Sequence, residues 1–223
     1  DEFLESIKIV LEKNTTPLLI RVHSHPKPAE LKRVLALLAN YSRVHTIDMS
    51  AVAIDGVLLG SLLDMINTNT SLKGLEIEKV SPTMPIPEGR KFWEVMLNRD
   101  LAGKFRRRIL RAFEEESVLE EFGDLWSLLV IMSLDDSKKA DVSLQNFDAV
   151  QHIAIYNSII SQNPSIRDRL TIRQMSNISF RCDYETLRPF LSAVHFSTSK
   201  SEVSHINCQN SDVTRMIRTY FPQ

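Results

Sequence analysis

The sequence has little cysteine, little glycine and almost no net charge. Two cysteines among 223 residues are too few for a disulfide framework, so we expect an intracellular, reducing location. Six glycines argue against phosphate-cradling loops. Lysine and arginine number 27 against 28 aspartates and glutamates, which argues against electrostatic capture of nucleic acid or of an anionic membrane.

Long apolar runs and catalytic motifs are also missing. No apolar run reaches the roughly 20 residues needed to cross a bilayer, so we expect a soluble, cytoplasmic protein without membrane contact. The sequence contains no P-loop, no G-x-G-x-x-G, no G-x-S-x-G, no H-E-x-x-H and no cluster of cysteine ligands. We therefore expect a protein that is not an enzyme and that uses no cofactor and no metal.

What the sequence does contain is a repeated apolar pattern. The stretches VHTIDMS (residues 44–50) and LKGLEIE (residues 72–78) share an L-x-x-L-x-L pattern at a spacing of 72 − 44 = 28 residues. Self-similarity at this period is typical of stacked strand–helix repeats. The same template predicts seven short parallel strands, with an irregular repeat near 98–105. These strands lie at residues 17–22, 44–49, 72–77, 125–130, 150–155, 175–180 and 203–208.

Amphipathic segments follow several of the predicted strands. Apolar residues recur at helical i, i+3, i+4, i+7 spacing in residues 30–41, 56–66 and 184–194. Three of the four N-x-S/T sequons, at Asn14, Asn40 and Asn69, stand three or four residues before the next strand. A helix often ends there with an asparagine in the left-handed conformation. We interpret these three sequons as helix C-caps rather than as glycan sites.

The alternation of strand and helix at this nearly constant spacing resembles a leucine-rich repeat domain of the ribonuclease-inhibitor type. Three stretches are more particularly similar to the leucine-rich repeat domain of tropomodulin and leiomodin: LEKNTTPLLIRVHS, LLDMINTNTSLKGLEIE and LNRDLAGKFRRRI. The sequence departs from ordinary leucine-rich repeats in mostly lacking their asparagine ladder, and its spacing falls to 150 − 125 = 25 residues in the second half.

The resemblance implies an α/β solenoid with a parallel strand ladder on the concave side and helices on the convex side. We expect a single domain over residues 1–223, with an irregular repeat or insertion around 80–120, that can form part of a longer protein. Stacked repeats supply a wide, rigid surface, which suits protein recognition.

The predicted function is that of a non-catalytic scaffold or adaptor that binds another protein through its concave face. The tropomodulin-like stretches imply a cytoskeletal, actin-regulatory role. A substrate-recognition domain of an F-box ubiquitin ligase is the alternative, and a nucleic-acid-binding or enzymatic domain is a further one. The sequence does not identify the partner protein.

Candidate partner-binding residues occupy strand positions outside the apolar template, where side chains face the concave side. Trp126 and Tyr156 would add an apolar patch there, of the kind found at interface hot spots. The candidates are Arg21, His45, Asp48, Lys73, Glu76, Trp126, Tyr156, Arg181 and His205.

The stretch KFRRRILRAFEEES (residues 104–117) predicts a helix with one apolar face and arginines around it. We interpret this helix as a solvated face, and its basic residues are kept as a secondary charged candidate site for an anion or an acidic partner. These residues are Lys104, Arg106, Arg107 and Arg108.

Overall fold

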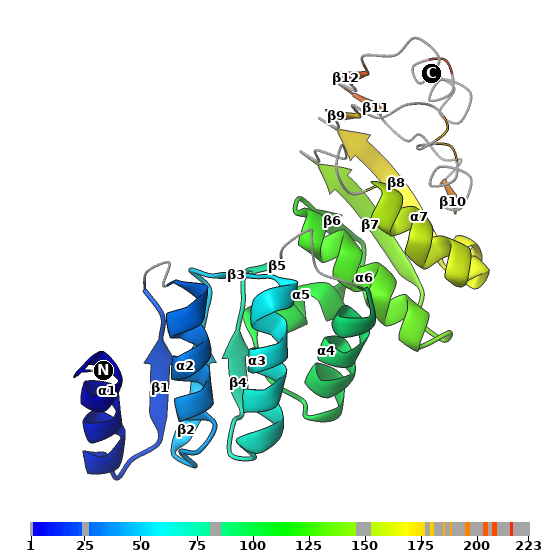
Figure 1. The fold of residues 1–223 in the computed structure, drawn as a ribbon. Helices are drawn as coiled ribbons and strands as arrows, with labels where there is room; N and C mark the ends of the chain where they lie inside the picture. Colours follow the sequence, from blue (N-terminus) through cyan, green and yellow to red (C-terminus); the bar gives the residue numbers. More distant parts are fainter. Residues whose placement is uncertain are drawn as a thin grey trace. The chain divides into compact units, whose positions relative to one another are not determined.

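The computed structural model describes residues 2–23, 27–80, 86–145, 153–176 and 179–180, and after these only short fragments up to residue 215. The chain divides into two compact units, unit 1 (residues 1–107) and unit 2 (residues 108–223). Each unit combines helices with parallel strands (Figure 1), so the predicted α/β class with parallel pairing is confirmed. The expectation of a single domain over the whole chain stays a prediction.

Unit 1 alternates helices with short strands. Its elements are α1 (Glu2–Lys13), β1 (Leu18–Arg21), α2 (Pro28–Leu38), β2 (Val44–Asp48), β3 (Ala53–Ile54), α3 (Gly56–Thr68), β4 (Gly74–Glu76), β5 (Lys79–Val80), α4 (Ile86–Asn98) and the start of α5 (Lys104–Arg111). The predicted strands at 17–22, 44–49 and 72–77 and the predicted helices at 30–41 and 56–66 are therefore confirmed, with shifted ends.

The main sheet of unit 1 has the predicted register. Its strand order is β1-β2-β4, with all pairs parallel. Ile20 lies opposite Ile47, and Ile47 lies opposite Leu75, as the repeat template predicts. An isolated parallel bridge continues the series by joining Gly74 to Ala102. This bridge falls where the spacing predicts an irregular repeat.

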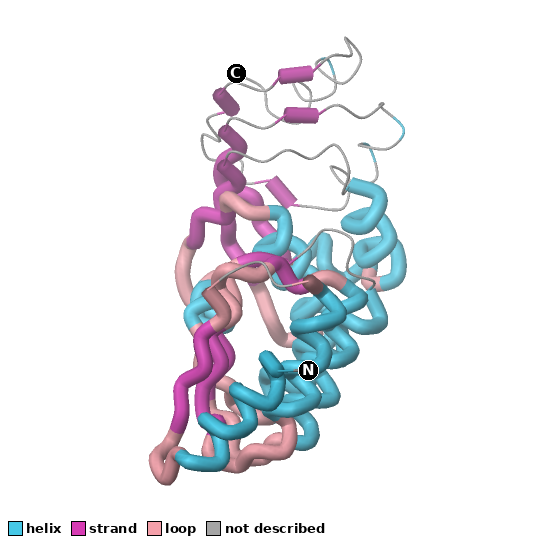
Figure 2. The backbone as a smooth tube through the Cα atoms, turned by 60° about the vertical axis from the view of Figure 1, so that its left-hand side comes forward, coloured by secondary structure: helices cyan, strands magenta, loops and turns pink. Residues whose placement is uncertain are grey.

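Helices α2, α3 and α4 lie on one side of these strands (Figures 1 and 2). Ile47 and Leu75 point into that helical layer and are 0% exposed. Burying each such side chain contributes about 1.5–3 kcal/mol. The helices supply the other half of the core, with Leu31, Leu35 and Leu38 from α2, Leu58, Leu59, Leu62, Met65 and Ile66 from α3, and Phe92, Trp93 and Met96 from α4.

The sequon asparagines at the helix ends do not adopt the expected left-handed conformation. Asn69, the C-cap of α3, has φ −84°, so the predicted left-handed geometry is wrong there. The side chains of Asn14 and Asn40 act instead: each amide nitrogen donates to the carbonyl four residues earlier, at 2.8 and 3.1 Å. The side-chain amide thus binds a carbonyl of the last helical turn, and at Val10 it adds to the backbone N–H of Asn14, which lies 3.3 Å from the same oxygen.

Unit 2 begins within α5 and is also built from parallel strands and helices. Its elements are β6 (Ser117–Leu119), α6 (Phe122–Leu134), β7 (Ala140–Gln145), α7 (Ile153–Gln162), η1 (Pro164–Asp168), β8 (Leu170–Ser176), β9 (Ser179–Phe180), β10 (His195–Phe196), β11 (Val203–Ser204) and β12 (Asn207–Cys208). Its larger sheet has the order β10-β8-β7-β6, and β11 also pairs with β8.

Two predicted strands of unit 2 are wrong. Residues 125–130 lie inside helix α6, and residues 153–155 begin helix α7, while 150–152 lie outside the described residues. The actual strands are β6 and β7, in which Ser117 pairs with Val142. The shorter spacing predicted for the second half therefore exists, but between other segments.

The C-terminal register is confirmed where it is described. Met175 lies opposite Val203, and Phe180 lies opposite Cys208, as the repeat template predicts. The predicted helix at 184–194 lies outside the described residues, apart from Glu185 and Arg188.

Candidate functional site

The predicted partner-binding residues of unit 1 gather along its sheet. Arg21 ends β1, His45 and Asp48 belong to β2, and Glu76 ends β4, with Lys73 directly before that strand. Arg21 lies opposite Asp48, and Asp48 lies opposite Glu76. Side chains in register point to the same face of a sheet, and here it is the face opposite the buried Ile47 and Leu75.

One line of charged side chains therefore crosses the strands. We call it the charged row and define it as Arg21, Asp48, Glu76 and Arg107. Arg107 belongs to it because its guanidinium approaches the carboxylate of Glu76, whereas Lys104 reaches Glu76 only through its backbone N–H. The row presents charges in the order positive, negative, negative, positive from β1 to α5.

Hydrogen bonds hold the β1 end of the charged row in place. Asp48 Oδ1 accepts from Ser50 Oγ at 2.7 Å and from the Ser50 backbone N–H at 3.1 Å. Asp48 Oδ2 accepts from Arg21 Nε at 2.8 Å. The hydrogen bonds from Ser50, followed by Arg21, lower the pKa of Asp48 below its usual value, against a smaller opposing effect of burial. Asp48 therefore stays ionised and orients the Arg21 guanidinium.

Glu76 organises the other end of the charged row. Its Oε2 accepts from the backbone N–H of Lys104 at 2.7 Å, so a strand carboxylate caps the first turn of α5. Arg107 Nη2 lies 4.0 Å from Glu76 Oε1, at the limit of an ion pair. The close approach depends on Gly103, because a Cβ there would lie 2.1 Å from the Leu75 carbonyl oxygen.

Beside the charged row lies a row of smaller residues on the same face. Thr46 lies opposite Gly74, and Gly74 bridges to Ala102. A Cβ on Gly74 would come within 3.2 Å of both the Ala102 carbonyl and the Thr46 side chain. The face is therefore shallow here, and Leu19, which lies opposite Thr46 and is 56% exposed, forms its apolar edge.

Trp126 and Tyr156 do not lie on any strand face. Trp126 belongs to α6 and is 0% exposed, and Tyr156 belongs to α7 and is 1% exposed. Burial raises the pKa of Tyr156 well above its usual value. Their proposed role as exposed interface anchors is therefore wrong. Arg181 and His205 lie outside the described residues.

The secondary charged site is a helix whose arginines mostly have acidic neighbours. The predicted helix is confirmed as α5, with Phe105 and Ile109 buried. Arg106 pairs with Asp100 at 2.9 Å. Arg108 donates two hydrogen bonds to the carboxylate of Asp124, at 2.9 and 2.7 Å.

Asp124 is nearly buried, and desolvation raises its pKa although Arg108 opposes this shift. Together these pairs neutralise Arg106 and Arg108, which favours a solvated helix face over an anion site at these two residues; Arg107 lies beside Glu76 on the charged row.

The sequence interpretation missed three polar side chains, each of which binds the turn of the preceding strand–helix segment. Asn69, 2% exposed, places its amide nitrogen 3.2, 3.1 and 3.4 Å from the carbonyls of Leu38, Tyr41 and Val44. The guanidinium of Arg99 donates in the same way one strand–helix segment later in unit 1, to the carbonyls of Ile66, Asn69 and Leu72.

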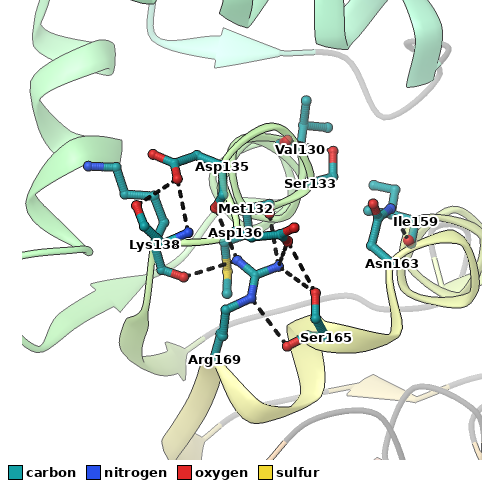
Figure 3. A network of polar contacts seen from close by, with 11 residues as sticks. Val130, Met132, Ser133, Asp135, Asp136, Lys138, Ile159, Asn163, Ser165 and Arg169 are labelled. Atoms are coloured by element: carbon teal, nitrogen blue, oxygen red, sulfur yellow. Dashed lines mark hydrogen bonds and ion pairs between the residues drawn. The ribbon is translucent and has the colours of Figure 1, made fainter.

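Arg169 repeats this arrangement in unit 2 (Figure 3). Its guanidinium donates to the carbonyls of Met132, Asp135 and Lys138 at 3.0, 3.1 and 3.1 Å. It also binds Asp136 Oδ1 at 3.0 Å and both oxygens of Ser165. In all three cases the carbonyls are spaced by three residues across the turn that follows a helix. The only sequence signal was the sequon asparagine, whose role was assigned to its own helix alone.

Unit 2 also has a charged pair on its strands. Arg173 of β8 donates through Nε to both carboxylate oxygens of Asp141 on β7, each at 2.7 Å. Sequence interpretation missed this pair because it placed neither strand correctly at these positions.

A hollow of about 290 Å³ lies between α2 and α3 in unit 1. It is lined by Lys32, Ala36, Ala39, Asn40, Ser61, Asp64, Met65 and Thr68. These residues include no nucleophile paired with a histidine base, and the hollow lies on the helical side rather than on the charged row.

Within the described residues, no three or more histidine, cysteine, aspartate or glutamate side chains come together as a metal site. No helix in that part of the chain is long and apolar enough to span a bilayer. Comparisons with protein-family models, with curated proteins and with solved structures each find no match.

Proposed function

We propose that this chain is a non-catalytic protein-binding module of the leucine-rich repeat type. It binds its partner through the strand face of unit 1 that carries the charged row. The observation that carries the proposal is the register that places Arg21, Asp48 and Glu76 side by side, on strands that follow one another at the repeat spacing. The partially exposed polar side chains on this face are held by one another, as rigid recognition surfaces require.

Two features support the repeat part of the proposal. Helices α2, α3 and α4 all lie on the same side of the sheet, which is the layering of a strand–helix repeat (Figures 1 and 2). The turns after α2, α3 and α6 each present three carbonyls to one side chain, from Asn69, Arg99 and Arg169 respectively. A bond that recurs in this way is what stacked copies of one unit would make.

The test is affinity capture from cell extract with two variants, each of which introduces one arginine. Thr46→Arg places a large side chain on the strand face, beside the charged row. Ala36→Arg, at an exposed position of α2, places the same side chain on the helical side. The proposal predicts that wild type and Ala36→Arg retain the same protein and that Thr46→Arg loses it.

Circular dichroism establishes that both variants fold. If Thr46→Arg retains the protein and Ala36→Arg loses it, the binding surface is the helical side and the proposal fails. The identity of the captured protein then separates an actin-regulatory role from substrate recognition in a ubiquitin ligase.

A further inference from the structure

The charged row is a rigid surface whose outermost groups are arginines. The side chain of Arg21 is 53% exposed over an Asp48 side chain that is 18% exposed. Likewise the side chain of Arg107 is 58% exposed beside a Glu76 side chain that is 22% exposed. A group that approaches this face therefore meets a guanidinium at each end of the row and the two carboxylates between them.

Arg21 is oriented so that one edge of its guanidinium stays available. Asp48 accepts a hydrogen bond only from Nε of Arg21, and Ser50 donates two hydrogen bonds to Asp48. Among the described residues, no hydrogen bond reaches the terminal nitrogens Nη1 and Nη2 of Arg21. These two nitrogens form the end-on fork that accepts a carboxylate with two parallel hydrogen bonds. Because the side chain is already fixed, little conformational entropy is lost when a ligand binds.

Arg107 offers a second guanidinium at the α5 end. Its only acidic neighbour in the described structure is Glu76, at 4.0 Å, and the strong bond of Glu76 goes to the Lys104 backbone instead. Three strand spacings of about 4.8 Å separate the β1 and α5 ends of the row, which is about 14 Å. Four residues of an extended chain cover about 13 Å, and residues i, i+2 and i+4 point to one side.

We propose that the charged row binds an extended peptide segment of the partner that carries an acid, a base and an acid at alternating positions. The two acids pair with Arg21 and Arg107, and the base between them pairs with Asp48 and Glu76. This inference rests on the proposed function, because it assigns the partner chemistry for the same face. Because Asp48 and Glu76 make the centre of the row negative, the row should prefer a peptide with a base between its two acids to a simple polyanion.

The experiment measures binding of two fluorescent peptides with the same composition. One is Gly-Glu-Thr-Lys-Thr-Glu-Gly, which has the proposed pattern. The other is Gly-Glu-Glu-Thr-Thr-Lys-Gly, which has the same net charge without the pattern. At about 50 mM salt, where exposed charges still interact, we expect the full chain to bind the patterned peptide about tenfold more tightly. Equal binding of the two peptides, including none detectable for either, overturns the inference.

A pair of variants assigns the effect to the row. Arg21→Gln combined with Arg107→Gln removes both forks without placing a new charge beside Asp48 or Glu76. The matched control, Lys13→Gln combined with Lys91→Gln, changes the net charge equally at two exposed helical positions. We expect the arginine variant to bind both peptides equally and the lysine variant to behave as wild type. A preference that survives in the arginine variant overturns the inference.

The same variants separate this inference from the proposed function. If Thr46→Arg loses the captured protein while the double arginine variant keeps it, the strand face is the binding surface but the acid–base–acid ligand is refuted. If neither variant loses it, the proposed function fails as well.

Discussion

Replacement of Arg169 by methionine should lower the free energy of unfolding of unit 2 much more than replacement of an exposed arginine in the same unit does. Arg169 is 8% exposed, and its guanidinium donates to three carbonyls at the end of α6 and in the following turn. Methionine retains most of the apolar stem and removes every donor. The substitution therefore isolates the hydrogen-bonding role of the side chain from its packing.

The expected loss in the free energy of unfolding follows from the backbone carbonyls that no longer have the Arg169 guanidinium as a donor. Each buried carbonyl that loses its donor costs about 1–3 kcal/mol. The Asp135 carbonyl keeps the backbone N–H of Lys138 as a donor at 3.2 Å, and the other two carbonyls, of Met132 and Lys138, are not independent, because one relaxation of the turn exposes them together. We therefore expect a loss of about 3–4 kcal/mol in the free energy of unfolding, a large share of the stability of a typical domain.

Urea denaturation followed by tryptophan fluorescence measures this loss. Trp126 reports on unit 2 in a Trp93→Phe background, because the sequence has two tryptophans and Trp93 belongs to unit 1. The control is Arg167→Met, an exposed position two residues earlier, which should change the free energy by less than about 0.5 kcal/mol. Equal unfolding midpoints for Arg169→Met and Arg167→Met would refute the reasoning.

Two further predictions concern unit 1. Gly103→Ala should destabilise the unit by about 1–3 kcal/mol in urea denaturation, since its Cβ would lie 2.1 Å from the Leu75 carbonyl oxygen. Gly60→Ala, where a Cβ meets nothing within 4 Å, should be neutral or stabilising; similar losses in both variants would contradict this account. Ser50→Ala removes the main cause of the lowered pKa of Asp48. A lowered pKa stabilises the fold above its ordinary value near 4 and loses that effect as the pH falls through the folded-state pKa. The stability gap between wild type and Ser50→Ala should therefore be larger at about pH 6 than at about pH 2.5, and a constant gap would contradict the assignment.

The first half of the chain could be predicted from sequence because its helices are amphipathic. In α2 the buried residues Leu31, Leu35 and Leu38 recur at helical spacing between exposed ones, so the period is unambiguous. The strands between such helices then follow from the constant spacing. Arg21, Asp48 and Glu76 were placed correctly along the sheet for this reason.

The second half failed because α6 is buried on all sides. Residues 125–132 are all buried, so the segment shows no polar face from which to read a helical period. Leu125 and Leu128 also fit the strand template by chance, because a spacing of three residues suits both a helix face and an L-x-x-L strand. Trp126, inside this segment, was consequently assigned to an exposed strand.

The hydrogen bonds that Asn69, Arg99 and Arg169 donate within each unit could not be predicted at all. Asn69, Arg99 and Arg169 are separated from the carbonyls that they bind by different numbers of residues along the sequence. The donor group also differs, because it is an amide in Asn69 and a guanidinium in the two arginines. Only the positions of the three carbonyls repeat, and backbone carbonyls leave no mark in a sequence. A buried arginine looks like a surface arginine until the turn that it binds is known.

The central claim is that the partner binds the strand face of unit 1, and site-specific photo-crosslinking tests it most directly. A photoreactive residue replaces Thr46 on the strand face or Ala36 on α2, and each chain is irradiated in cell extract. The account predicts a discrete protein adduct from position 46 that excess unlabelled wild type suppresses, and no such adduct from position 36. A suppressible adduct from position 36 alone would contradict it.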